Sequence, residues 1–216
     1  MRGCFAWLAV SLLCVVAASS TASAQDLRNG PDGHVFAKLM FGFGGEGEVE
    51  ADDLAGIDGE GDLEFSYGLG GGYMHSLHEN FALGGQLALV SWQSEVGENA
   101  DLDRNTLFDI SIVPQGKLVV LDNLELYATL PLGLTFDFLG EDDFGNLAEV
   151  GTGFGFNFAL MLGARVAITD ELGLLGELGY TYHSFSHPTE TAIGDGPDLD
   201  MTMGQLALNL GGYYAL

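Results

Sequence analysis

Residues Thr152–Ala167 alternate strictly between large apolar side chains and small or polar ones. One face of this run carries Phe154, Phe156, Phe158, Leu160, Leu162, Ala164 and Val166, and the other carries Gly153, Gly155, Asn157, Ala159, Met161, Gly163 and Arg165. A period of two residues is typical of a β-strand. A strand that crosses a membrane needs about 9–11 residues, apolar towards lipid and small or polar towards the lumen. The run therefore predicts a membrane-spanning strand.

The same pattern recurs along the rest of the chain. The predicted strands are His34–Phe43, Leu63–Ser76, Phe81–Trp92, Arg104–Val120, Leu124–Phe138, Thr152–Ala167, Leu172–His183 and Met201–Leu216. Short turns rich in Asp and Asn alternate with long polar segments, and these are Gly44–Asp62, Ser94–Asp103, Gly140–Glu149 and Ser184–Asp200. This layout predicts an all-β fold, an antiparallel up-and-down transmembrane β-barrel of about eight strands. The barrel would occupy residues 34–216, with short periplasmic turns and long acidic extracellular loops.

Three residues fit the strand pattern less well. Pro114 and Pro131 interrupt strands that a closed barrel must pair on both sides, which indicates local bulges or kinks. Trp92 falls on the inward side of its strand unless a bulge intervenes.

The face opposite the apolar stripe distinguishes a membrane barrel from a soluble eight-stranded one. That face is mostly Gly, Ala, Ser, Thr, Asn and Met, and only 17% of the chain is charged. A soluble surface needs about 25–35% charged residues. Most acids lie in the four long segments instead. The low charge of this face favours a membrane barrel, with apolar residues towards lipid and a polar lumen. A periplasmic or secreted barrel is the alternative.

The N-terminus has the features of a secretory signal peptide. Arg2 supplies the positive charge, an apolar stretch follows, and Ala22–Ala24 is a small-x-small cleavage site. We therefore expect a signal peptide over residues 1–24 and a short segment over 25–33 before the barrel. A lipoprotein is not favoured, because Leu13 rather than a small residue precedes Cys14.

Composition excludes several classes of function. Both cysteines, Cys4 and Cys14, lie in the expected signal peptide, so the mature chain has no thiol nucleophile or thiolate metal site. The net charge of −25, with only 6 Lys and Arg, argues against nucleic acid as a partner. We expect no cofactor, no metal and a monomer.

The few charges within strands are expected to point into the lumen. They are Lys38, Glu64, Asp109, Lys117, Glu125, Asp137, Arg165 and Glu177. If the turn at Thr169–Leu172 has a three-residue loop, Arg165 and Glu177 face each other across two strands, which predicts an ion pair. Lys117 and Glu125 would form a second, diagonal pair. Either charge could instead lie near a wet barrel end.

These features resemble the small outer-membrane β-barrel proteins of diderm bacteria, in particular the outer-membrane protein A, X and W types. The resemblance covers the whole mature chain and implies residence in the outer membrane. It also implies that the last strand is read by the barrel-insertion machinery through alternate apolar residues. Here Leu208, Leu210, Tyr214 and Leu216 occupy such positions, although Leu216 departs from the usual terminal aromatic residue.

Two acidic or glycine-rich motifs are weak candidates for binding sites. Gly42, Gly44 and Gly47 form a G-x-G-x-x-G pattern, but acids rather than a helix follow, and they would repel phosphate. The run Asp58–Glu64 alternates carboxylates, yet lacks the glycine of a calcium loop. Diffuse bridging by divalent cations between the acids and lipopolysaccharide phosphates is the favoured reading.

A third candidate is a cluster of hydroxyl and imidazole groups at the end of one strand. Its members are His183, Ser184, Ser186 and His187, with Glu190 close behind. A serine hydrolase needs a base within hydrogen-bond reach of the serine. The segment lacks the motif of lipid A deacylases, and His183 and Ser186 fall on opposite faces.

The favoured function is therefore non-enzymatic, as a structural barrel or minor passive conduit. Eight strands leave an interior that side chains can fill. A narrow channel for small solutes is one alternative, because the inward glycines Gly68, Gly70, Gly72, Gly153, Gly155 and Gly163 remove side-chain volume. A surface lipid hydrolase and adhesion or ligand binding through the acidic loops are the others.

Overall fold

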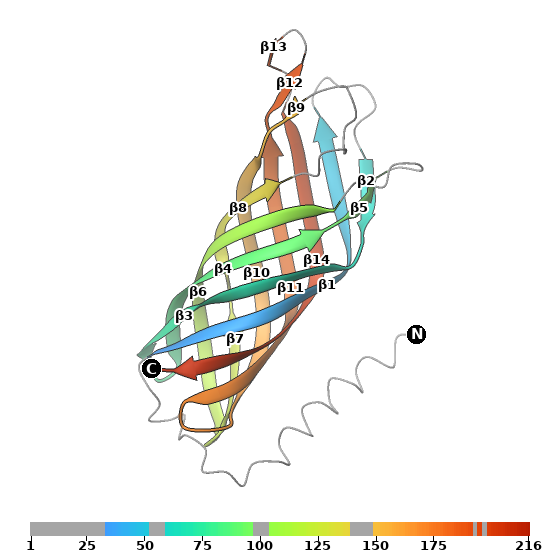
Figure 1. The fold of residues 1–216 in the computed structure, drawn as a ribbon. Helices are drawn as coiled ribbons and strands as arrows, with labels where there is room; N and C mark the ends of the chain where they lie inside the picture. Colours follow the sequence, from blue (N-terminus) through green and yellow to red (C-terminus); the bar gives the residue numbers. More distant parts are fainter. Residues whose placement is uncertain (1–32, 52–58, 97–103, 139–148, 192–193, 196–197) are drawn as a thin grey trace, which may run out of the picture.

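The computed structural model describes residues 33–51, 59–96, 104–138, 149–191, 194–195 and 198–216, and these form a closed antiparallel β-barrel (Figure 1). Its wall consists of β1 (Gly33–Ala51), β3 (Ser66–His78), β4 (Phe81–Trp92), β6 (Asn105–Leu121), β7 (Leu124–Thr129) continued by β8 (Leu132–Phe138), β10 (Gly153–Ala167), β11 (Leu172–His187) and β14 (Leu199–Ala215). The last strand pairs back onto the first, from His34 opposite Ala215 to Ala51 opposite Leu199. The predicted barrel of about eight strands is confirmed.

Short strands extend the wall at the end away from the tight turns. They are β2 (Gly59–Leu63), β5 (Ser94–Val96), β9 (Glu149–Val150), β12 (Thr189–Thr191) and β13 (Gly194–Asp195). β2 and β5 extend the barrel sheet, whereas β9, β12 and β13 pair in a separate three-stranded sheet, and β12 and β13 lie at the far tip (Figure 1). The predicted long loops are thus partly strand, because backbone pairing continues past the point where apolar alternation stops. Among the described residues, no helix is long and apolar enough to cross a membrane.

A bulge in β1 marks where the wall changes character. Gly44 has a φ of +53°, a conformation that glycine adopts readily. The register against β14 shifts by one residue between Phe43 and Gly45. The inward positions therefore change from even to odd numbers, with Lys38 inward before the bulge and Val49 inward after it.

The two prolines are accommodated without opening the ladder. Pro131 separates β7 from β8, so the predicted strand Leu124–Phe138 is split, and its carbonyl accepts the Ala159 N–H at 2.9 Å. Pro114 remains within β6, and its carbonyl accepts the Leu130 N–H at 3.1 Å. The sequence-based expectation of local irregularity is confirmed at Pro131.

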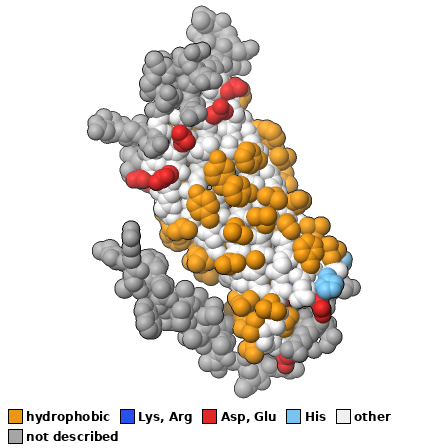
Figure 2. Space-filling view, turned by 180° about the vertical axis from the view of Figure 1, so that it is seen from behind, with side chains coloured by type: hydrophobic (Ala, Val, Ile, Leu, Met, Phe, Trp, Pro, Cys, Tyr) orange, Lys and Arg blue, Asp and Glu red, His pale blue; other side chains and the backbone are white. Residues whose placement is uncertain are grey.

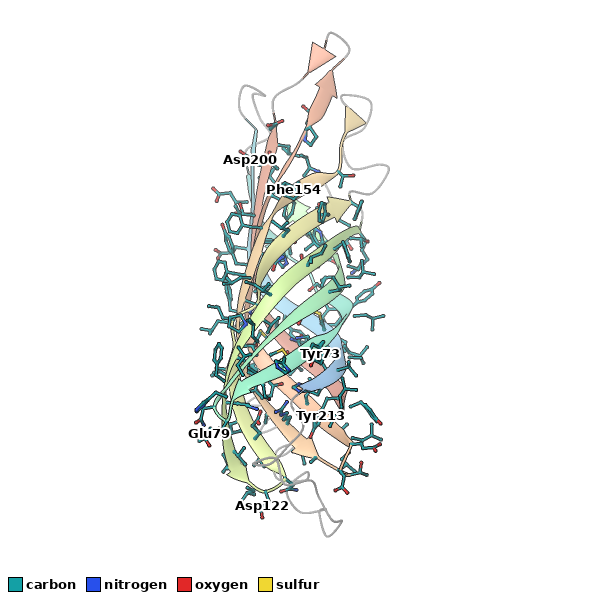
Figure 3. The ribbon with its side chains drawn as sticks, turned by 90° about the vertical axis from the view of Figure 1, so that its left-hand side faces the viewer. Tyr73, Glu79, Asp122, Phe154, Asp200 and Tyr213 are labelled. Carbon is teal, nitrogen blue, oxygen red and sulfur yellow. The ribbon has the colours of Figure 1, made fainter. Side chains whose placement is uncertain are left out.

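The outer surface carries an apolar band. Figure 2 shows large hydrophobic side chains over the middle of the barrel, with acidic groups beyond them at both ends. Glu79 and Asp122 lie at the turn end, whereas Phe154 and Asp200 lie towards the other end (Figure 3). Leu162, in the middle of β10, leaves 66% of its surface exposed. Every strand of the wall carries at least one exposed large hydrophobic residue, as expected of a surface that contacts lipid.

Aromatic residues concentrate where the band meets the acidic end. Phe43 and Phe65 lie 5.3 Å apart between ring centroids, and the Arg104 guanidinium lies 5.0 Å from the Tyr67 ring centroid. Further pairs continue round the barrel, including Phe136 with Phe154 and Phe158 with Tyr182. Aromatic girdles of this kind occupy the interfacial level of membrane barrels.

Beyond that girdle the polarity of the wall inverts. A buried apolar cluster fills the interior there, and its members are Val49, Leu63, Val90, Trp92, Leu107, Phe185, Leu199, Met201 and Met203. The outward positions at this level include the exposed acids Glu46, Glu48, Asp62 and Asp200. The same strands are therefore apolar outside within the band and apolar inside above it, as expected where lipid gives way to water.

The apolar band predicts a depth-dependent response to charge. Leu162→Arg should lower the free energy of unfolding by about 2–4 kcal/mol, because the new charge faces the middle of the hydrocarbon. Glu48→Arg places the same side chain beyond the girdle and should cost less than about 1 kcal/mol. Urea titration of both variants in lipid vesicles measures the difference, and equal costs would contradict the position of the band.

Candidate functional site

The lumen is the candidate site, because the strands bring most of their polar side chains together there. Inward positions on every strand carry buried hydrogen-bonding groups, among them Lys38, Gln86, Asp109, Glu125, Asn157, Arg165, Glu177, His183, His187 and Asn209. Six of the charges predicted to point inward are buried in the lumen, namely Lys38, Asp109, Glu125, Asp137, Arg165 and Glu177. Lys117 is only half-buried, and Glu64 lies half-buried between β2 and β3. Tyr213, on β14, marks the level near the turn end of the barrel (Figure 3).

Arg165 and Glu125 form the ion pair nearest the turn end. They are direct cross-strand partners between β10 and β7, and their Nε and Oε1 atoms lie 2.9 Å apart. Arg165 Nη2 donates a hydrogen bond to Glu125 Oε2 at 2.9 Å, which adds to the charge attraction between the two groups. The guanidinium lies 5.5 Å from the Tyr213 ring centroid and within hydrogen-bond distance of the His34 ring. Ionic and aromatic partners thus surround this buried cation.

Lys38 and Glu177 form a second pair deeper in the lumen. Lys38 Nζ donates to Glu177 Oε2 at 2.7 Å, although β14 separates their strands. Asn209 Nδ2 donates to the same oxygen at 2.8 Å, and Tyr127 Oη donates to Oε1 at 3.2 Å. Side chains from three strands therefore donate to the Glu177 carboxylate on a fourth strand. These hydrogen bonds compensate the loss of its hydration.

The Arg165–Glu177 pair predicted from sequence was wrong, because the turn between β10 and β11 is centred one residue earlier than assumed. Ala167 lies opposite Gly173, which places Arg165 opposite Leu175 and Glu177 opposite Gly163. Arg165 reaches Glu125 instead.

Lys117 lies diagonally across from Glu125, as predicted, but the predicted ion pair between them does not form. Lys117 lies opposite Tyr127, two positions from the residue that Glu125 faces, and its Nζ donates to Ser76 Oγ at 2.8 Å. The diagonal pair with Glu125 is thus replaced by a bond to a neighbouring turn-end hydroxyl.

Two histidine–aspartate pairs, which the sequence analysis missed, occupy the other half of the lumen. His183 Nε2 lies 3.0 Å from Asp109 Oδ2, and His187 Nε2 lies 3.1 Å from Asp137 Oδ2. Strand parity was the available signal, since both histidines share the parity of the inward Glu177. Parity alone does not choose partners across the lumen, so the pairs needed the three-dimensional structure.

Each histidine–aspartate pair has further partners. Asp109 Oδ1 accepts from Thr135 Oγ1 and from Asn157 Nδ2, and Asn157 Oδ1 accepts from Ser111 at 2.9 Å. Trp92, inward as its parity predicted, donates through Nε1 to Asp137 Oδ1 at 3.0 Å.

His187 contacts acceptors through both ring nitrogens. Its Nδ1 lies 2.8 Å from the Gly151 carbonyl, while its Nε2 faces the Asp137 carboxylate. The doubly protonated ring satisfies both of these contacts.

The serines of the proposed hydrolase cluster lie on the other side of the wall. His183, Phe185 and His187 are buried in the lumen, whereas Ser184 and Ser186 alternate with them and point outward. The expected separation of His183 and Ser186 onto opposite faces is confirmed. No serine–histidine couple forms within this segment of the described chain.

The other motifs considered from sequence give no built site. Gly42, Gly44 and Gly47 all lie within the long strand β1, not in a strand–turn–helix unit. Part of the run Asp58–Glu64 lies outside the described residues. Within the described ranges, no group of three or more His, Cys, Asp or Glu side chains could hold a metal ion.

Small cavities interrupt the packing of the lumen among the described residues, one at its centre and one nearer the turn end. The central one has a volume of about 40 Å³ and is lined by polar groups from Lys38, Asp109, Thr181 and His183, among others. The second, nearer the turn end, has a volume of about 20 Å³ and contacts Arg165 and Glu177. Lys38 and Gln86 line both, so the Lys38–Glu177 pair lies at the boundary between them.

The closed barrel, its apolar exterior, its polar lumen and its aromatic girdle can be compared with known protein families. The model of the outer membrane protein beta-barrel domain family matches residues 10–212. The chain belongs to this family. Membership of this family implies a location in the bacterial outer membrane. In such barrels the tight turns lie on the periplasmic side and the long connections on the extracellular side.

Solved outer-membrane barrels share this fold at low sequence identity. The outer membrane protein OprG from Pseudomonas aeruginosa has a TM-score of 0.62 and 8% identity, covering 88% of this chain and 98% of its own. AlkL, an outer membrane protein studied in lipid bilayers, has a TM-score of 0.51 and 15% identity, covering 87% of this chain and 92% of its own. No curated protein sequence matches the chain. These likenesses concern the fold alone.

The ion-pair assignment predicts which charges are coupled. Lys38→Met should lower the free energy of unfolding by about 3–5 kcal/mol, because it leaves Glu177 buried without its cation. Adding Glu177→Gln to that variant should recover much of the loss. Denaturant unfolding in lipid gives the coupling energy by a double-mutant cycle.

Arg165 provides the matched control for this cycle. Arg165→Met should couple strongly with Glu125→Gln and only weakly with Glu177→Gln. Strong coupling of Arg165 with Glu177 would instead restore the pairing expected from sequence.

Proposed function

We propose that this outer-membrane protein is a structural, non-enzymatic barrel with a filled lumen, in which passive conduction is at most minor. One observation carries the proposal: buried ion pairs and their hydrogen-bonded partners cross the lumen, and the two cavities beside them measure only about 40 and 20 Å³. A cavity needs about 10–15 Å³ to hold each water molecule, so these spaces hold a few waters rather than a stream of solutes.

The inward glycines support the same conclusion. At Gly163 the space that a side chain would occupy is taken by the Tyr127 ring, and at Gly153 it is taken by the His187 ring. At Gly70 it is taken by Met40, and at Gly68 and Gly155 by neighbouring backbone. These glycines therefore make room for packing across the wall and lumen, which argues against the narrow solute channel.

The remaining alternatives have less support. A lipid hydrolase would need Ser184 or Ser186 to reach a histidine that lies on the opposite side of the wall. Adhesion or ligand binding would use acidic loops that lie largely outside the described residues. The signal peptide expected over residues 1–24 also lies outside the described residues. Export with cleavage of this signal peptide stays part of the proposal.

The proposed partners are lipid, lipopolysaccharide and the insertion machinery. Leu208, Leu210 and Tyr214 lie at outward positions of β14, and the exposed Leu216 follows directly after it. We propose that the insertion machinery reads these residues. No second chain is needed to complete the wall, so we propose a monomer.

The acidic residues above the girdle supply the contact with lipopolysaccharide. Glu46 and Asp62 are direct cross-strand partners, an arrangement of like charges that is unfavourable without a counterion. We propose that divalent cations bridge such pairs to lipopolysaccharide phosphates.

Conductance separates a filled barrel from a channel. The refolded mature chain, residues 25–216, should give no steady single-channel current in a planar bilayer, because ion pairs occupy its cross-section. Folding is verified beforehand by the heat-dependent gel mobility that membrane barrels display. A reproducible conductance from protein folded by that criterion would refute the filled-lumen proposal.

Cation bridging is tested by neutralising the acidic pair. The double variant Glu46→Gln/Asp62→Asn should bind lipopolysaccharide vesicles several-fold more weakly in the presence of Mg²⁺, with little difference once EDTA is added. Asp122→Asn, at the periplasmic end, is the matched control and should bind like the parent. Equal Mg²⁺-dependent binding by all three proteins would contradict the bridging model.

A further inference from the structure

Four of the residues that line the central cavity each carry a buried side-chain polar atom without a hydrogen-bond partner among the described residues. These atoms are Gln86 Oε1, Thr181 Oγ1, His183 Nδ1 and Asn209 Oδ1, and each belongs to a side chain that is more than nine-tenths buried. They come from three strands, β4, β11 and β14. Buried polar groups are nearly always satisfied in folded proteins, by protein or by ordered water. Their presence around one cavity therefore indicates a bound ligand.

The charges around the cavity indicate that this ligand is neutral. Lys38 is already paired with Glu177, and Asp109 is already paired with His183. Asp109 also accepts hydrogen bonds from Thr135 and Asn157, which leaves it poorly placed to coordinate a cation. Burying a further unpaired ion here would be strongly unfavourable.

The unpartnered atoms also indicate that this ligand donates hydrogen bonds. Asn209 uses its Nδ2 for Glu177, so its unpartnered Oδ1 remains as an acceptor. Gln86 presents a second amide oxygen. When the His183 ring carries one proton, that proton lies on Nε2 beside Asp109, and Nδ1 is an acceptor too. A volume of about 40 Å³ accommodates about three molecules of the size of water.

We propose that the central cavity is a binding site for a cluster of about three ordered water molecules. The waters donate to Gln86, Asn209 and His183 and exchange hydrogen bonds with the Thr181 hydroxyl. Because Asn209 also bonds Glu177 and His183 also bonds Asp109, the cluster joins the two ion pairs into one hydrogen-bonded network. The site does not depend on whether the lumen conducts.

The position of the site implies slow exchange with bulk water. On the extracellular side the apolar cluster around Trp92, Leu107 and Met203 closes the lumen. On the periplasmic side lie the Lys38–Glu177 pair and then the Arg165–Glu125 pair. Water held between these layers is part of the folded structure.

The variant Thr181→Val tests the proposal with little change in side-chain shape. If the hydroxyl is bonded to ordered water, its loss strands a water molecule, and the urea midpoint of the folded barrel in lipid should fall. If the cavity is dry, the variant removes an unsatisfied hydroxyl, and the midpoint should rise. Thr202→Val is the matched control, because Thr202 lies on an outward position of β14 and should leave the midpoint unchanged.

A second measurement reads the site directly and does not require the variant to fold. A high-resolution crystal structure of the parent should contain about three water peaks within hydrogen-bond distance of Gln86, Thr181, His183 and Asn209. An empty cavity, or a peak that gives an anomalous signal after exchange into rubidium, would overturn the proposal.

Discussion

Closure of the sheet between β1 and β14 is the constraint on which the rest of this structure depends. A backbone in hydrocarbon has no water to satisfy its N–H and C=O groups, so an open edge cannot persist there. The pairing of β1 with β14 runs the whole length of both strands, from His34 opposite Ala215 to Ala51 opposite Leu199. Even the two prolines keep their carbonyls in the ladder, at Pro114 and Pro131. Once the wall is closed, every strand has one face towards lipid and one towards a narrow interior.

The environment outside the wall then decides which face is apolar. Within the membrane, Leu and Phe point outward and the interior accepts polar groups. Above the aromatic girdle, water replaces lipid, and the interior becomes the apolar side, with Val49 and Met203 packed inside and Glu48 exposed outside. The bulge at Gly44 lets β1 change the parity of its inward residues at this level. One continuous strand can thus follow the rules of a membrane protein along one part and those of a soluble protein along another.

The narrow interior in turn forces the charged groups into contact. Eight strands leave space that side chains fill, so a buried charge must find a partner within the lumen. Lys38 reaches Glu177 past β14, and Arg165 forms an ion pair with Glu125. The packing that results gives the barrel its proposed structural role, and it also encloses the polar cavity in which we place ordered water.

The sequence by itself determined the fold, because strand periodicity is a local property and lipid imposes it on every strand alike. It also determined which charges point inward, and the predicted strand Phe81–Trp92 matches β4 at both ends. Tertiary structure decided the partners. A shift of one residue in the turn after Ala167 moves Arg165 from Glu177 to Glu125, and no local pattern fixes that register. The histidine–aspartate pairs likewise join strands that are remote in sequence, because contacts across a lumen depend on the tilt and closure of the whole wall.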